Sequence, residues 1–186
     1  MSIAYTAMMI AREAHKNQVR KYTGNPYTDH LAEVAGIVAT VTNRDALNAE
    51  CLIATAWLHD VMEDCGIGAA ELTAMLYDEH KHGIGETEQV VRGVMFLSDL
   101  ESGNRATRKR LSCERLAKAP RWVQTIKYAD LISNTSSIVE HDPDFAKVYL
   151  REKRELLKVM TKGDKRLREI AWGLCGPETK EETYEH

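Results

Sequence analysis

The chain has 186 residues, of which 28% are charged and 44% are hydrophobic, and its formal net charge is −3. This length suits one domain of ordinary size that buries its own core. No segment approaches the ~20 consecutive apolar residues that cross a bilayer, which excludes a membrane-spanning protein and predicts a soluble one.

The four cysteines have neither a CxxC spacing nor a close pairing, and the beginning of the chain does not resemble the basic leader of a secretory signal. We therefore expect reduced thiols and a cytoplasmic location. The sequence predicts no oligomeric state.

Positive charge is concentrated in residues 104–127, where eight Lys and Arg side chains accompany Glu114 as the one acidic residue. Such a segment either attracts a polyanion or forms a solvated helix face, and both interpretations remain open. A nucleic-acid partner is less favoured, because the segment lacks repeated aromatic side chains for base stacking and the whole chain is acidic.

Apolar residues recur at helical spacing along most of the chain, and no window alternates as a strand does. We therefore predict an all-α fold. The first helix follows a capping Ser2, while Pro120 and Asp142-Pro143 mark later starts, and Gly24-Asn25-Pro26 places a loop between residues 16 and 28. The predicted helices span residues 3–14, 29–42, 45–64, 69–81, 86–97, 104–119, 120–140, 143–162 and 164–174.

The last ten residues, 177–186, are rich in charge and poor in apolar side chains. Such a composition predicts a flexible acidic tail. The folded domain is therefore expected to span residues 1–176.

Four ionisable residues, His59, Asp60, Glu63 and Asp64, continue the apolar stretch 51–58. At 100° per residue they share an arc of roughly 140° that extends the buried stripe of that helix. Three carboxylates and an imidazole that point inward repel one another and lose hydration, so a cation or a polar cavity must compensate them. This pattern predicts a metal site.

Two further residues complete the site if the helices pack around this pair. His30 stands at the start of the second predicted helix, and Asp130 lies in line with the apolar residues Val123 and Ile126. Taken alone, His30 also suits a helix cap or loop, and Asp130 also suits an exposed position. Two imidazoles and two carboxylates favour Mn²⁺, Fe²⁺ or Zn²⁺ over calcium, and the spacing does not choose among the three.

An ordered series of motifs resembles the HD-type hydrolases of the RelA/SpoT group, and in particular a small stand-alone alarmone hydrolase. The motifs are His15-x-x-Gln18-x-Arg20-Lys21, Gly24-x-Pro26-Tyr27-x-x-His30, Leu58-His59-Asp60-x-x-Glu63-Asp64 and Lys127-x-Ala129-Asp130-x-x-x-Asn134. The resemblance covers about residues 4–162. It implies an HD-domain helical bundle of about eight to nine helices and a metal-dependent hydrolase domain over residues 1–176.

The resemblance also implies a role for each matching residue. It implies that His30, His59, Asp60 and Asp130 bind one Mn²⁺ ion, and that Glu63 and Asp64 activate or orient the attacking water. It further implies that the substrate is contacted by Arg20, Lys21, Asn134, Ser137 and Tyr149.

The implied activity is Mn²⁺-dependent removal of the 3′-diphosphate of guanosine tetra- or pentaphosphate, which gives GDP or GTP and pyrophosphate. Two alternatives stay open: a phosphatase for another ribose-phosphorylated nucleotide such as NADPH, and a nucleotide-sensing module without catalysis. The implied partners are a guanosine polyphosphate substrate and, functionally, an alarmone synthetase.

Overall fold

The computed structural model describes residues 2–43, 48–78 and 82–176, and within these ranges it contains ten helices and no β-strand. The all-α prediction is confirmed. The helices are α1 (Ile3–Ala14), α2 (Tyr27–Ala39), α3 (Ala49–Leu58), α4 (Val61–Cys65), α5 (Ala69–Leu76), α6 (Ile84–Leu97), α7 (Arg105–Lys118), α8 (Arg121–His141), α9 (Pro143–Val159) and α10 (Lys165–Cys175). None of these helices is long and apolar enough to span a membrane.

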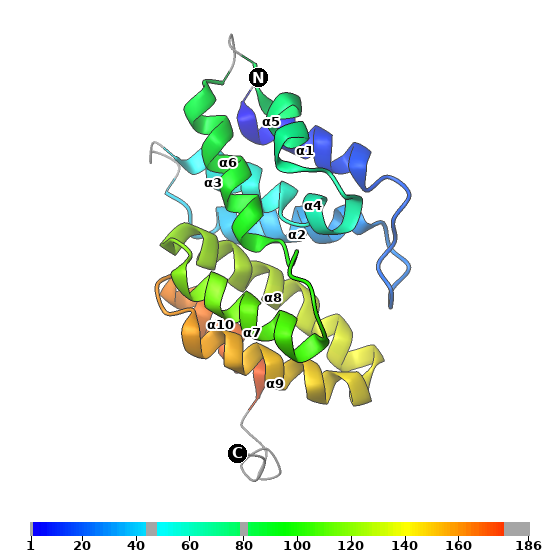
Figure 1. The fold of residues 1–186 in the computed structure, drawn as a ribbon. Helices are drawn as coiled ribbons and strands as arrows, with labels where there is room; N and C mark the ends of the chain where they lie inside the picture. The colour runs from blue at the N-terminus through cyan, green and yellow to red at the C-terminus, as the bar shows by residue number, and fades with distance from the viewer. Residues whose placement is uncertain (1, 44–47, 79–81, 177–186) are drawn as a thin grey trace.

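The helices form two groups, each with its own apolar core (Figure 1). In the first, α1 and α3 to α6 bury aliphatic side chains such as Leu58 and Leu72. In the second, α8 runs between α2, α9 and α10 and contributes Ile126 and Tyr128 to the core. Helices α2, α3 and α6 supply buried residues to both cores, so the two groups join along them.

The predicted helix 45–64 is wrong as one continuous element, because it breaks at His59 and Asp60 into α3 and α4. The Nδ1 atom of His59 lies 2.8 Å from the carbonyl oxygen of Ala56. An uninterrupted helix would give that oxygen to the N–H group of Asp60. The imidazole therefore takes the place of a backbone donor at the break. The predicted start of this helix at residue 45 and the tail 177–186 lie outside the described residues.

The predicted loop before α2 is confirmed and has a defined shape. Val19 and Pro26 form an isolated antiparallel bridge, and Gly24 closes the turn between them with a φ of 72°. Glycine adopts this left-handed conformation without steric cost. The turn brings the residues after α1 beside the beginning of α2.

Close packing at Gly93 joins α6 to α3 and α8. A Cβ atom at this position would lie 2.3 Å from the ring of Trp122 and 2.7 Å from the methyl group of Thr55. We predict that Gly93→Ala lowers the free energy of unfolding by about 1–3 kcal/mol, because the ring and the methyl group must shift.

The matched control is Gly36→Ala in α2, where a Cβ atom would meet nothing within 4 Å. This change should stabilise the protein by about 0.5–1 kcal/mol, since alanine loses less backbone entropy. Urea unfolding followed by circular dichroism measures both variants. A Gly93→Ala protein as stable as the wild type would contradict the packing described.

Candidate metal centre

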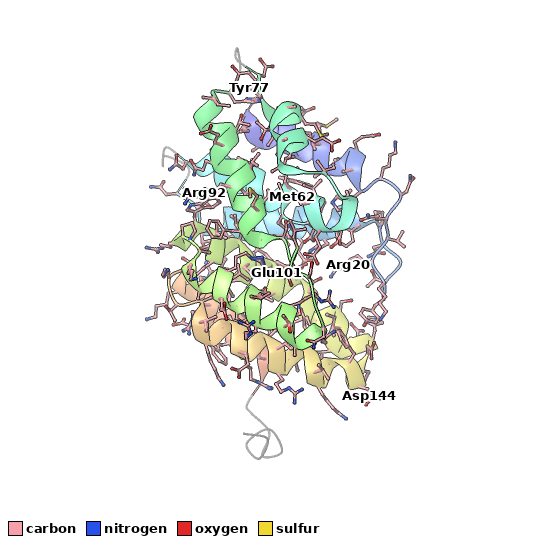
Figure 2. All side chains as sticks on the ribbon, in the orientation of Figure 1. Arg20, Met62, Tyr77, Arg92, Glu101 and Asp144 are labelled. Carbon is pink, nitrogen blue, oxygen red and sulfur yellow. The ribbon has the colours of Figure 1, made fainter. Side chains whose placement is uncertain are left out.

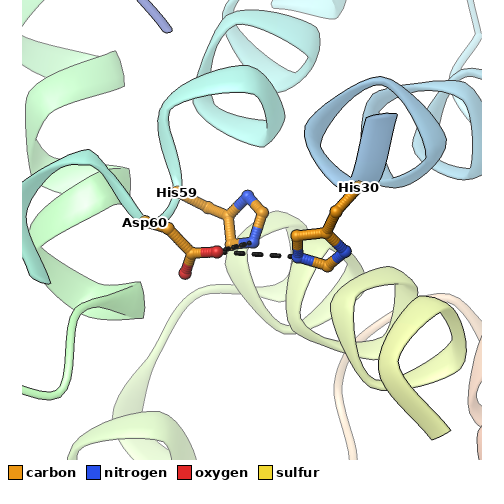
Figure 3. A group of neighbouring side chains, drawn as sticks. All are labelled: His30, His59 and Asp60. Carbon is orange, nitrogen blue, oxygen red and sulfur yellow. Dashed lines mark ion pairs between the residues drawn. The ribbon is translucent and has the colours of Figure 1, made fainter. Parts of the chain in front are cut away.

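Three side chains from two places in the fold converge on one point (Figure 3). His30 lies in the first turn of α2, while His59 and Asp60 occupy the break between α3 and α4. Their ligand atoms all lie within 4.8 Å of one another. The Oδ2 atom of Asp60 is 2.9 Å from Nε2 of His59 and 3.5 Å from Nε2 of His30. The helix break is what allows consecutive residues to face the same point.

Hydrogen bonds on the far side of each ring fix the orientation of both imidazoles. The Nδ1–H group of His59 donates to the carbonyl oxygen of Ala56, which can only accept. The Nδ1 atom of His30 lies 2.8 Å from the hydroxyl oxygen of Ser133, and that hydroxyl donates its own hydrogen to Glu33. His30 must therefore donate from Nδ1, so Nε2 of each ring, which carries a lone pair whenever the ring is neutral, points at the carboxylates.

The two Nε2 atoms are buried, and neither has a hydrogen-bond partner among the described residues. A lone pair that faces a carboxylate oxygen is unfavourable unless a proton or a metal ion lies between them. Burial by itself lowers the pKa of His59, but Asp60 and Asp130 outweigh it and raise that pKa to about 10. The site thus attracts positive charge strongly. Imidazole nitrogen and carboxylate oxygen are the ligands that a divalent transition ion takes.

Asp130 extends this group from α8. Its Oδ1 atom lies 3.5 Å from Nε2 of His30 and 3.7 Å from Nε2 of His59. The same oxygen accepts a hydrogen bond of 2.7 Å from Asn134, while Oδ2 pairs with Lys127 at 2.9 Å. Asp130 is buried, and despite the desolvation its pKa stays well below the usual range because Lys127 and the histidines stabilise the charge. The predicted fourth ligand, Asp130, is therefore ionised and lies next to both imidazoles.

A cavity of about 960 Å³ opens onto this group and is lined by Asp60 and Asp130. Glu63 and Asp64 also line it, one turn beyond the helix break. Burial raises the pKa of both carboxyl groups, and the nearby Asp60 adds to that rise. Glu63 is held in place because its Oε2 atom accepts the backbone N–H of Asp99 at 2.9 Å.

Cationic side chains line the same cavity. They come from α7, α8 and α9, and they are Arg105, Arg108, Lys109, Arg110, Lys127, Arg151, Lys153, Arg154 and Lys158. Several of them pair with acidic side chains: Lys109 with Asp99, for example, at 3.0 Å. The basic segment identified in the sequence therefore faces the candidate metal centre in part, through α7 and Lys127.

The structure brings only some of the predicted substrate contacts to this cavity. Asn134 and Tyr149 line it. Arg20 and Ser137 instead line a second cavity of about 270 Å³ beside α8. Lys21 is exposed, and its Nζ atom lies 3.2 Å from the hydroxyl group of Tyr22.

Several residues support the site without having been assigned a role from the sequence. The hydroxyl group of Tyr27 donates to Oδ2 of Asp60 at 2.7 Å, and Lys127 pairs with Asp130. Both stand in the motifs quoted above, at three residues from a predicted ligand. Ser133 and Glu33 hold the far side of His30, and their contact depends on two helices that are distant in the sequence.

A family model described as an HD domain matches residues 7–119, which is more than half of the chain. The chain belongs to the HD domain family. HD-domain membership agrees with the His30, His59 and Asp60 group, which marks a candidate site for a divalent metal ion.

Two curated relatives align with most of this chain. A probable guanosine-3′,5′-bis(diphosphate) 3′-pyrophosphohydrolase of Synechocystis sp. is 29% identical over 154 residues, which are 81% of this chain and 18% of that protein. The guanosine-3′,5′-bis(diphosphate) 3′-pyrophosphohydrolase of Vibrio cholerae is 31% identical over 153 residues, which are 80% of this chain and 20% of that protein. The chain thus spans about a fifth of the length of these relatives.

A solved structure confirms the HD-domain fold. It is described as a metazoan ortholog of SpoT that hydrolyses ppGpp and plays a role in starvation responses. The two folds superpose with a TM-score of 0.77, and the match covers 94% of each chain at 21% sequence identity.

The geometry predicts that Asp60→Ala removes divalent metal binding, because Asp60 faces both imidazoles and the remaining groups lose their bridging carboxylate. Calorimetric titration with Mn²⁺ measures the loss. The matched control is Asp144→Ala. The Asp144 side chain is 98% exposed on α9, so this variant should bind the ion as the wild type does. Equal affinity in the Asp60→Ala protein would place the metal elsewhere.

Proposed function

We propose that this chain is a metal-dependent pyrophosphohydrolase that removes the 3′-diphosphate of guanosine tetra- or pentaphosphate. The products are GDP or GTP and pyrophosphate. One observation carries this proposal: Asp60 and Asp130, whose carboxylates face two buried imidazole nitrogens, share the wall of a cation-lined cavity with Glu63 and Asp64. The names of the relatives in Synechocystis and Vibrio cholerae support this choice of substrate.

The ion proposed for this site is Mn²⁺, held by His30, His59, Asp60 and Asp130. The mixed nitrogen and oxygen ligands suit Mn²⁺, and they also accept Fe²⁺ or Zn²⁺. When bound, such an ion supplies Lewis acidity at the scissile phosphate and makes water a better nucleophile.

Glu63 and Asp64 are the groups proposed to handle the attacking water. They border the cavity next to the ligands, and their raised pKa values bring them closer to the neutral range in which a general base accepts a proton efficiently. The water's oxygen forms a bond to the phosphorus next to the ribose, and the bond from that phosphorus to the 3′-oxygen breaks. The 3′-oxygen leaves with a proton, and the diphosphate departs whole.

The cationic lining is proposed to bind the polyphosphate. Lys127 pairs with Asp130 of the site, Lys109 pairs with Asp99 on the cavity wall, and Asn134 and Tyr149 offer polar contacts for the nucleotide. Substrate contacts by Arg20, Lys21 and Ser137 remain a prediction, since these three side chains do not line the large cavity. The same proposal includes a cytoplasmic location and functional pairing with an alarmone synthetase.

The products test the proposal. Incubation of the protein with guanosine 3′,5′-bis(diphosphate) and Mn²⁺, followed by anion-exchange chromatography, should yield GDP and pyrophosphate in equal amounts. Orthophosphate as the first product, together with dephosphorylation of NADPH, would identify a phosphatase. Nucleotide binding without turnover would identify a sensing module. Either result would overturn the proposed function.

A change at Glu63 separates water handling from metal binding. Glu63→Gln keeps the shape of the side chain but cannot accept a proton, so turnover should fall by ~10²–10⁴-fold, the usual contribution of a positioned acid or base. Metal occupancy, measured by mass spectrometry of the native protein, should not change. Glu71→Gln, at an exposed position of α5, is the control for loss of a carboxylate. Loss of the metal in Glu63→Gln would make Glu63 a ligand instead.

A further inference from the structure

We propose that Arg20 is a positioning residue of the metal centre, which ties together the groups that orient His30 and Asp130. The proposal builds on the metal-binding part of the proposed function and does not depend on which nucleotide is hydrolysed. It gives Arg20 a task that differs from the substrate contact predicted from the sequence.

The guanidinium group of Arg20 contacts three partners, and the side chain is only 15% exposed. Its Nη2 atom donates to the carbonyl oxygen of Ser133 and to Oδ1 of Asn134, both at 3.2 Å. Its Nη1 atom lies 3.5 Å from Oε2 of Glu33. These partners belong to α8 and α2, the two helices that carry Asp130 and His30.

The first connection runs through Asn134 to Asp130. Because the amide oxygen of Asn134 accepts from Arg20, the amide nitrogen is turned toward Asp130 and donates to its Oδ1 at 2.7 Å. This is the Asp130 oxygen that lies 3.5 Å from Nε2 of His30 and 3.7 Å from Nε2 of His59. Loss of the arginine contact would free the amide to rotate, and the position of Oδ1 would be less defined.

The second connection runs through Glu33 and Ser133 to His30. Arg20 faces the carboxylate of Glu33, which accepts the hydroxyl hydrogen of Ser133 at 2.6 Å. The hydroxyl oxygen is thereby left to accept from Nδ1 of His30 at 2.8 Å. This chain of hydrogen bonds keeps the proton on Nδ1 and the Nε2 lone pair at the centre.

The turn before α2 fixes the backbone position of Arg20. The backbone N–H of Arg20 donates to the carbonyl oxygen of Asn25 at 2.8 Å, and its carbonyl oxygen accepts from Gly24 at 3.0 Å. Figure 2 shows Arg20 at the level where α1 to α6, in the upper half of the view, meet α7 to α10, in the lower half. Only a planar fork with several donors can reach a carbonyl, an amide and a carboxylate from one anchored position.

The test measures Mn²⁺ affinity directly, by competition with a chelating fluorescent indicator, in the absence of any nucleotide. Arg20→Gln should bind Mn²⁺ about 10- to 100-fold more weakly, as loss of groups that orient metal ligands generally does. Arg20→Lys, which keeps the charge without the fork, should restore only part of the affinity. Lys16→Gln removes an exposed positive charge near the same turn and should bind the ion as the wild type does.

A second pair of variants covers the case in which Arg20→Gln does not fold. Ser133→Ala breaks the connection to His30 at another point and should also weaken Mn²⁺ binding, whereas Ser136→Ala, at an exposed position of the same helix, should not. In the double variant of Arg20 and Ser133, the loss of Mn²⁺ binding free energy should be smaller than the sum of the losses in the two single variants, since both changes act on His30.

Wild-type Mn²⁺ affinity in folded Arg20→Gln, accompanied by a raised KM for the nucleotide, would overturn the proposal and assign Arg20 to substrate binding alone. Wild-type affinity in folded Ser133→Ala would overturn it as well. A wild-type protein that fails to hydrolyse guanosine polyphosphates would overturn the proposed function and leave the metal-affinity comparison intact.

Discussion

Two imidazole nitrogens and two carboxylate oxygens face one another inside the protein, and much of the local structure serves to hold them there. His30 and His59 each donate the Nδ1 hydrogen to an acceptor behind the ring, so that the Nε2 lone pair of the neutral ring points toward Asp60 and Asp130. Burial makes this arrangement unfavourable without a cation between the groups. A divalent ion held by these four groups would remove the conflict, and it would supply the Lewis acidity that the proposed hydrolysis needs.

Three parts of the fold bring these four side chains to one point. The break between α3 and α4 places His59 and Asp60 side by side, α2 brings His30, and α8, which packs against α2, α3 and α6, carries Asp130. Close packing at Gly93 fixes α6 against α3 and α8. The large cavity then joins the ligands to cationic side chains, so that a polyphosphate can reach them.

The sequence predicts the all-α fold and most helix positions because apolar residues recur at helical spacing. It also predicts that His59, Asp60 and Asp130 point inward, because they lie in line with apolar residues, whereas the place of His30 beside them is implied by the resemblance to the HD-type hydrolases. The break at His59 is not visible in the sequence, since the chain has neither glycine nor proline there and the break is accompanied by a side-chain hydrogen bond from His59 to Ala56. The Arg20 side chain points inward because of the turn that carries it and its hydrogen bond to Ser133, which is more than 100 residues away in the sequence. Local sequence patterns do not reveal such a contact.

The most direct test of this account is a crystal structure of the protein grown with Mn²⁺, with anomalous scattering measured at the manganese absorption edge. We expect one strong anomalous peak about 2.0–2.3 Å from Nε2 of His30 and of His59 and from a carboxylate oxygen of Asp60 and of Asp130. A protein saturated with Mn²⁺ that shows no peak at this point, or a peak held by other side chains, would contradict it.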